Sequence, residues 1–206
     1  MKRRKPSTPF IRVLTLTKAY ILLVLLFYIF SINAEVALDL DRLLDRIRVE
    51  PPARVAFTEQ RQNRLLKEPM VLGGYLAYPA AGRLEKVVET PFRETLRVNG
   101  NEISITRDGE ERRISLRNRA SFRVMLNSIE AIMAGGGETL REHFDATVSG
   151  NDANWRIELL PRQRRLARQL LRMEVTGGAQ VESIRFELPD GEWQYLEIHG
   201  DEPADG

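Results

Sequence analysis

The sequence predicts an α+β fold, mainly β with a few helices, in which about eleven antiparallel strands form one curled sheet. Apolar and polar side chains alternate from Phe57 to Leu116, and the turn dipeptides NG at 99–100 and DG at 108–109 separate the alternating runs. Alternation around such dipeptides is typical of an antiparallel meander. A helical apolar pattern follows before strand patterns return. Because the sheet is apolar on one face, we expect helices over its concave opening.

The first 34 residues have the pattern of an export signal. Basic residues open the chain, and an unbroken apolar stretch from Ala19 to Phe30 falls short of the roughly twenty residues that cross a bilayer. We expect cleavage after Ala34, with Ala37 as the second choice. An uncleaved membrane anchor is the alternative, which the short stretch disfavours. No cysteine follows, which excludes a lipid-modified N-terminus, so we expect export across a bacterial inner membrane into the periplasm.

Cleavage would reverse the sign of the net charge. The whole chain has 31 basic and 29 acidic residues and a pI near 9.0, which alone would suggest a nucleic-acid partner. Six basic and no acidic residues lie in the first 34 positions, so the remainder carries a formal charge of −4. We therefore expect no nucleic acid among the partners.

The rest of the chain has the size and composition of one domain. Its 172 residues are enough for a sizeable core, so we expect one domain over 35–200 and a polar tail over 201–206. The absence of cysteine means that this core, without disulfides, must stabilise an exported protein. It also excludes thiol catalysis and thiolate metal sites.

Local patterns before residue 118 predict one helix and then the meander. Asp39 is a suitable cap for a helix over 38–49, which Pro51-Pro52 ends. Gly73-Gly74 indicates a bend or a close approach of two backbones. The strands are expected near 55–66, 70–78, 83–89, 93–98, 101–107 and 111–117.

The second half combines a helical insert with further strands. Apolar residues at spacings of three and four predict a helix from about Ser121, and the three glycines at 135–137 end it. A short second helix over 138–144 follows, and we interpret the glycines as a hinge between the two. The segment 161–168 is ambiguous and fits a helical turn. Strand patterns return around Trp155–Leu159, Met173–Val175, Ile184–Leu188 and Trp193–Ile198.

These segments, in this order, resemble the periplasmic outer-membrane lipoprotein carrier family, LolA. The helix DLDRLLDRI is followed by AFTEQR, by the strand GGYLAYP and by the hairpin RVNGNEISI. The insert IEAIMAGGGETLREHF and then WRIELLPR continue the family order. The resemblance covers roughly Leu38 to Ile198 and is one of pattern and order, without a single diagnostic motif.

The resemblance implies an incomplete antiparallel barrel of about eleven strands with a helical lid over an apolar cavity. It implies a monomeric carrier that takes acyl chains of a lipoprotein or another lipid from an inner-membrane donor to an outer-membrane acceptor, without covalent chemistry. Two alternatives remain: a lipid-sensing envelope regulator that binds a partner protein, and a structural envelope protein whose barrel is solidly packed.

Inward-facing apolar residues are the candidate lipid-binding positions. Ordinary core packing is the competing interpretation for every one of them, and the sequence does not separate the two. The candidate lid face consists of Phe122, Met125, Leu126, Ile129, Ile132 and Met133. The candidate cavity positions on strands are Leu72, Leu76, Leu96, Ile103, Ile105, Ile114, Leu116, Trp155, Ile157, Ile184 and Phe186.

Two further features concern the lid and the surface. The family usually has an arginine before the proline that ends the second strand, where it latches the lid; here Tyr78 precedes Pro79, and the nearest arginine is Arg83. Tyr78 and Arg83 are therefore candidate latch residues. Arginines concentrate over 162–172, which is either a solvated face or a patch that docks an acidic partner or an anionic headgroup surface. Its candidate docking residues are Arg164, Arg165 and Arg168.

Enzymatic patterns are missing from the sequence. His143 and His199 are the only histidines, far apart and without metal-ligand spacing. There is no G-x-S-x-G, no G-x-G-x-x-G, and no P-loop lysine after the glycines at 135–137. We expect a binding protein with no catalytic residue, no metal and no cofactor.

Overall fold

The computed structural model describes residues 38–117 and 119–199. The expected export signal, its cleavage site and the polar tail lie outside these residues. No helix within the described ranges is long and apolar enough to cross a bilayer.

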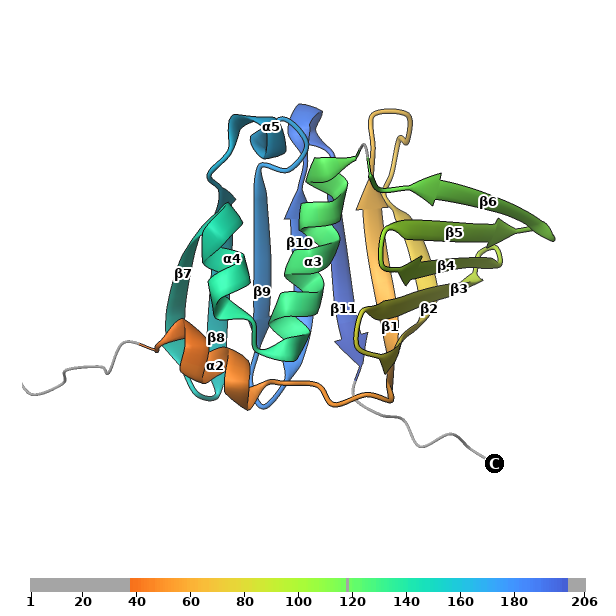
Figure 1. Cartoon of the computed structure of the whole chain (residues 1–206). Helices are drawn as coiled ribbons and strands as arrows, with labels where there is room; N and C mark the ends of the chain where they lie inside the picture. The colour runs from red at the N-terminus through yellow and green to blue at the C-terminus, as the bar shows by residue number, and fades with distance from the viewer. Residues whose placement is uncertain (1–37, 118, 200–206) are drawn as a thin grey trace, which may run out of the picture. The chain divides into compact units, whose positions relative to one another are not determined.

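All described strands belong to one antiparallel sheet. Its order is β6-β5-β4-β3-β2-β1-β11-β10-β9-β8-β7, so every pair of consecutive strands except β6 and β7 is adjacent, and the first strand also pairs with the last. The sheet is open, with β6 and β7 at its edges (Figure 1). The strands are β1 Ala53–Gln62, β2 Met70–Ala80, β3 Arg83–Thr90, β4 Glu94–Asn99, β5 Glu102–Arg107, β6 Glu110–Ser115, β7 Phe144–Asn151, β8 Asn154–Pro161, β9 Arg172–Gly177, β10 Val181–Glu187 and β11 Trp193–His199.

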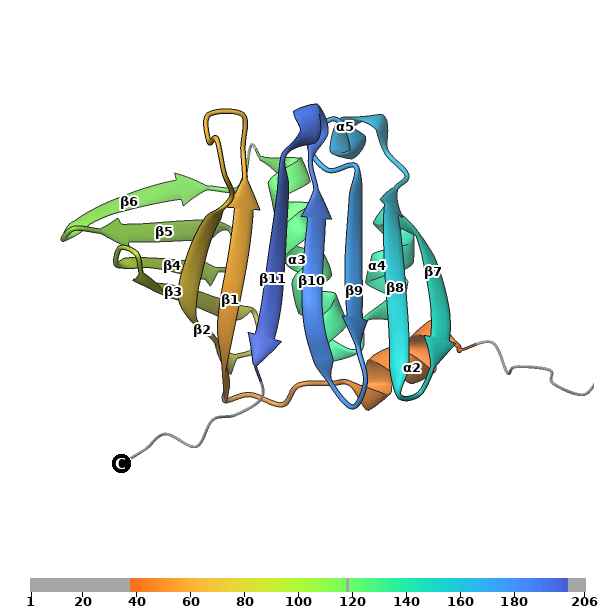
Figure 2. The same ribbon diagram turned by 180° about the vertical axis from the view of Figure 1, so that it is seen from behind.

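The helices lie on one face of this sheet. In Figure 1 the helices α2, α3 and α4 lie in front of β7–β11, and β3–β6 bend toward the same side of the sheet beside α3. Figure 2 shows the opposite face, which these helices leave bare. The helical elements are α2 Leu40–Arg46, α3 Ala120–Ala134, α4 Gly137–His143, α5 Arg164–Ala167 and the short 3-10 turn η1 Pro189–Gly191. The expected α+β class, an incomplete antiparallel sheet of eleven strands with helices over one face, is confirmed.

Turn glycines determine the tight hairpins. Gly100 and Gly109 have φ values of +55° and +83°, which glycine adopts without strain. A register shift lies between Gly73 and Gly74, and a Cβ at Gly74 would collide with the carbonyl of Val87. The close approach expected at these two glycines is therefore confirmed.

Several expected boundaries were too long. β1 ends at Gln62, not near 66, because the side chain of Asn63 accepts a hydrogen bond from the Leu65 amide (2.9 Å) and turns the chain. α2 ends at Arg46, and the Val49 amide instead donates to the carbonyl of Met133 (2.8 Å). The ambiguous segment 161–168 contains the four-residue helix α5.

The three covering helices are tied together by polar contacts. Arg48 donates from Nε and Nη2 to the carbonyl of Ala134 at 3.1 and 2.9 Å, which joins the end of α2 to the end of α3. Arg141 of α4 pairs with Asp41 of α2 at 2.6 Å. Gly135 ends α3 with φ +81°, and the chain turns directly into α4. The helices therefore form one connected cover.

Candidate functional site

The strand register places all the predicted inward positions on one face of the sheet. Phe57 faces Gly74 and Ile198, and the same phase continues through Leu76 to Leu96, Ile105 and the other strands. We call this the inner face; it is the face that α2, α3 and α4 cover. The predicted positions nevertheless have two different environments.

Under the helices the inner face is fully packed. Trp155, Ile157 and Met173 expose 2% or less of their surface, as do Ile132 of α3 and Leu140 of α4. They belong to one continuous core cluster with α2. Trp155 also donates from Nε1 to the carbonyl of Gly178 at 2.7 Å. In this part the predicted positions Trp155, Ile157 and Ile184 are core residues of the cluster that also contains the helices.

On β3–β6 the inner face is only partly covered. A second, smaller cluster contains the buried residues Val98, Ile103 and Leu116. Half-buried apolar residues surround it, among them the predicted positions Leu96, Ile105 and Ile114 together with Leu84. Of the cover, only Leu126 of α3 packs against this cluster.

The apolar face predicted for α3 is two faces. Val124, Met125, Ala131 and Ile132 belong to the large core. Phe122, Leu126, Ile129 and Met133 recur at i, i+4, i+7 and i+11 and therefore lie along a neighbouring stripe of the helix. Leu126 reaches the second cluster, Ile129 and Met133 are half-buried, and Phe122 is 39% exposed. We call these four residues the open stripe.

A charged group lies on the inner face between the two clusters. Glu59 is 1% exposed and pairs with Lys86 of β3 and, at 2.9 Å, with Arg61. The Lys86 ammonium also lies 4.9 Å from the centre of the Phe57 ring. The side chains of Lys86 and Arg61 remain 22% and 35% exposed, so both cations are in partial contact with solvent. We call Glu59, Arg61 and Lys86 the charged group.

Burial shifts the titration of these basic groups. It lowers the pKa of Lys86 to about 8, and the carboxylate of Glu94 opposes part of that shift. It lowers the pKa of Arg61 in the same way. Both side chains are still largely protonated at neutral pH and balance the buried carboxylate. The sequence analysis missed this group. The strand alternation could have indicated it, because Lys86 is on the same face of its strand as Leu84 and Val88, and Glu59 is on the same face as Phe57.

The candidate latch residues have different environments. Tyr78 is 4% exposed at the end of β2, and burial raises the pKa of its phenol, with the carboxylates of Glu130 on α3 and of Glu50 adding to the shift. Arg83 is exposed. Among the described residues, neither side chain forms a hydrogen bond or an ion pair with α3. A latching role for them stays a prediction.

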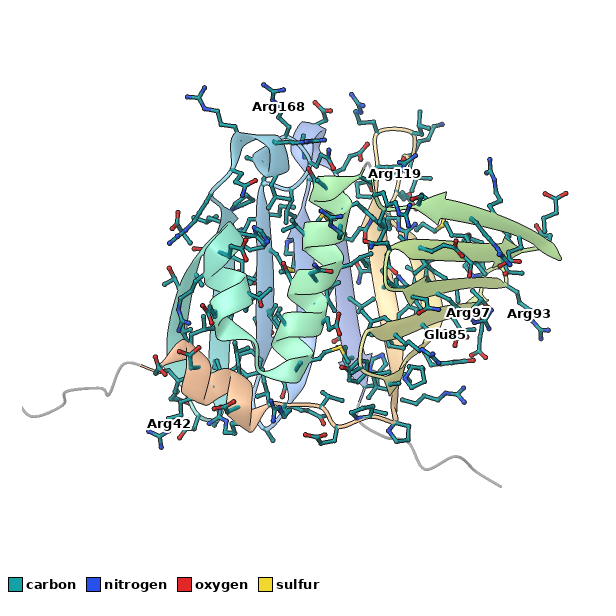
Figure 3. The ribbon with its side chains drawn as sticks, viewed as in Figure 1. Arg42, Glu85, Arg93, Arg97, Arg119 and Arg168 are labelled. Atoms are coloured by element: carbon teal, nitrogen blue, oxygen red, sulfur yellow. The ribbon has the colours of Figure 1, made fainter. Side chains whose placement is uncertain are left out.

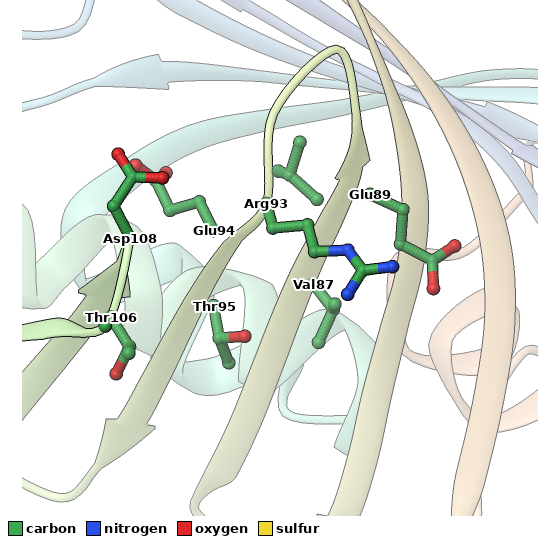
Figure 4. Close-up of a pocket in the computed structure, with 9 residues that line it drawn as sticks. Val87, Glu89, Arg93, Glu94, Thr95, Thr106 and Asp108 are labelled. Carbon is green, nitrogen blue, oxygen red and sulfur yellow. The ribbon is translucent and has the colours of Figure 1, made fainter.

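A pocket of about 540 Å³ opens between the β3–β4 and β5–β6 turns. Glu89, Glu94 and Asp108 line it together with Arg93 and two threonines, so its charge is mainly negative (Figure 4). This lining does not suit an acyl chain. Within residues 38–117 and 119–199 no group of three or more histidine and carboxylate side chains is arranged to hold a metal ion.

The docking arginines predicted from the sequence lie at one end of the sheet. Arg164, Arg165 and Arg168 are exposed on and after α5, where Figure 3 shows Arg168. Arg119, at the start of α3, lies at the same end (Figure 3). Ser121 in the first turn of α3 donates to the carbonyl of Arg165 at 3.5 Å, so α3 and α5 are in contact there.

The described residues thus form an open antiparallel sheet with a connected helical cover on its apolar face. The family model described as outer membrane lipoprotein carrier protein LolA-like matches residues 32–200. The chain therefore belongs to this LolA-like family, which confirms the resemblance seen in the sequence.

Solved structures give weaker likenesses. A LolA superfamily protein from Nitrosomonas europaea is 10% identical with a TM-score of 0.42, and the match covers 78% of this chain and 90% of that one. The lipoprotein LppX from Mycobacterium tuberculosis is 11% identical with a TM-score of 0.41, over 78% and 93% of the two chains. At these values they add nothing to the family assignment. No curated protein matches the chain significantly.

Proposed function

We propose that this protein is a periplasmic carrier that binds acyl chains of a lipoprotein or another lipid and moves them from an inner-membrane donor to an outer-membrane acceptor without covalent chemistry. Membership of a family described as lipoprotein carriers supports the proposal. The single observation that carries it is the open stripe of α3 opposite the half-buried residues of β3–β6. These apolar side chains lie on a face where ordinary packing is incomplete.

In this proposal the acyl chain lies between the open stripe and the inner face of β3–β6. Apolar burial gives about 0.8 kcal/mol for each methylene group, so twelve of them would contribute about 10 kcal/mol before lid contacts are lost. The polar end of the cargo would face the charged group, where Lys86 and Arg61 have donors that Glu59 does not use. Release would require α3 to regain its own contact with the second cluster.

The lid movement in this proposal is a shift of α3 relative to α4 and to the large core. Gly135 and Gly136 join α3 to α4, and the candidate latch at Tyr78 lies near Glu130 of α3. The glycine link and the candidate latch would each influence how readily α3 leaves the sheet. In this proposal the protein is a monomer and has no catalytic residue.

Recovery of bound lipid tests the proposal directly. The protein is purified from the envelope of cells that produce it, and native mass spectrometry identifies any lipid that remains bound. We expect one or more acylated species. A bare protein that also fails to bind a fluorescent fatty acid would contradict the carrier function.

Substitutions on the two faces of α3 test where the acyl chain lies. Ile129→Glu places a charge on the half-buried open stripe, so we expect weaker binding of a fluorescent fatty acid with an unchanged β-sheet signal in circular dichroism. Thr139→Glu, on the exposed side of α4, is the control for the added charge. Equal affinities of the two variants would remove the open stripe from the binding site.

A further inference from the structure

The largest exposed apolar side chains all lie at one end of the sheet. Within the described residues they come from the β1–β2 loop, the start of β2, the first turn of α3, the end of β8 and the start of β9, segments that meet at the end where α5 lies (Figure 1). Their exposures range from 39% to 93%. They are Leu65, Val71, Phe122, Leu160 and Leu171.

Exposed arginines lie at the same end of the sheet as these apolar side chains. Arg119, Arg164, Arg165 and Arg168 lie at this end, and none of the four forms an ion pair with a carboxylate of the described residues. Two other arginines near this end are paired with carboxylates, and the first is Arg162, which pairs with Asp145 at 2.8 Å. Arg64 likewise pairs with Asp190 at 3.3 Å. We call the four unbalanced arginines together with Leu65, Phe122, Leu160 and Leu171 the basic end.

Packing within the fold does not account for this arrangement. Leu65 is 93% exposed in a hairpin loop, although the same loop is ordered by hydrogen bonds from Leu65 and Gln62. Leu171 is half-exposed although its amide donates to the Glu187 carbonyl at 2.7 Å. Apolar side chains on well-ordered backbone, with cations at the same end of the sheet, indicate a surface that meets a partner.

We propose that the basic end docks on the surface of an anionic lipid bilayer. Arginine and an anionic leaflet attract one another, and long arginine side chains extend to the headgroups while their stems stay apolar. A bilayer accepts apolar side chains from separate segments at any spacing, whereas a protein partner would need a matching pocket for each. Leu65, at the tip of a hairpin loop, would enter the headgroup layer first. The inference goes beyond cargo binding, because docking of this kind needs no cargo.

The chain has no cysteine, which allows a test at single positions. Leu65→Cys is labelled in the full-length protein with an environment-sensitive dye, and vesicles of phosphatidylcholine with or without phosphatidylglycerol are added. We expect a blue shift only with the anionic vesicles. Arg42→Cys, exposed on α2 at the opposite end (Figure 3), is the control and should show no shift. An unshifted dye at position 65 would overturn the proposal.

Neutral substitutions measure the electrostatic part. An arginine near an anionic surface contributes about one kcal/mol, so Arg164→Gln with Arg168→Gln should lower vesicle partition by roughly 30-fold. Arg42→Gln with Arg93→Gln removes the same charge far from the basic end and should leave partition within about twofold. Equal losses in the two double variants would overturn the proposal.

An acidic protein is the competing partner. Retention on immobilised polyglutamate, dependent on Arg164 and Arg168 but without any binding to anionic vesicles, would replace the bilayer with a protein surface. The fluorescent fatty-acid measurement is independent of both results, so docking and cargo binding can fail separately.

Discussion

Two groups of strands on the inner face have the same alternating pattern but differ in what covers them: β7–β11 are the covered side, and β3–β6 are the partly covered side. On β8 and β9, Ile157 and Val175 are fully buried under the helices. On β4 and β5, Leu96 and Ile105 have the same inward phase but are only half-buried. The connected cover of α2, α3 and α4 lies on β7–β11, and only Leu126 of α3 packs against the second cluster. The covered side is core, and the partly covered side is where a ligand can replace existing contacts.

The largest expected effect comes from a matched pair of truncations. Ile157→Ala removes a fully buried side chain and should lower the free energy of unfolding by about 4 kcal/mol. Ile105→Ala, on the partly covered side, should cost about 1 kcal/mol, because water already reaches part of that side chain. Urea unfolding measures both. Equal losses would show that the two sides are packed alike.

The charged group should give the next largest effect. Glu59→Gln leaves Lys86 and Arg61 without their buried carboxylate, so we expect a loss of about 2 kcal/mol in the free energy of unfolding. The partial exposure of both cations keeps this below the cost of a fully buried charge. In Glu59→Leu combined with Lys86→Leu the loss should be smaller than the sum of the two single losses. Additive losses would contradict a direct pairing.

The smallest effect is expected on the bare outer face. Arg172 pairs with Glu187 at 2.6 Å, and its guanidinium lowers the pKa of that carboxyl below the ordinary value of 4.5. A lowered pKa stabilises the folded protein above the unfolded value, and this stability is lost as the pH falls through the folded pKa. Glu187→Gln should therefore cost below about 1 kcal/mol at pH 7, and the cost should shrink as the pH falls below 4.5 and through the lowered pKa. A cost that does not decrease with falling pH would contradict an ionic origin.

Alternation and turn residues were sufficient to predict the sheet but not its coverage. The hairpins at Gly100 and Gly109 formed as expected, since positive φ there depends on local sequence. The sequence analysis did not predict β7. This strand lies at the edge of the sheet, and small or polar residues alternate with Phe144, Ala146 and Val148, so its apolar pattern is weak. Helix boundaries depended on tertiary contacts, such as Val49 with Met133.

The candidate site was predictable only in part. All the inward strand positions face inward, yet their division into core and partly covered residues depends on where α3 lies. The sequence predicts one apolar face for the helix that contains Phe122 and Met133. In the structure the apolar residues of this helix, α3, contact two different clusters. Glu59 and Lys86 are charged residues at strand positions where the alternation predicts apolar, inward-facing ones. That they form an ion pair could not be predicted without the register of β1, β2 and β3. The lipid itself stays a proposal.

Amide hydrogen exchange with and without a bound fatty acid tests the central claim most directly. If acyl chains bind on the partly covered side, exchange should change in α3 and in β3–β6 and stay unchanged in β8 and β9. Protection that changes only in β8 and β9, or nowhere despite saturating ligand, would contradict the division of the inner face into a core and a binding side.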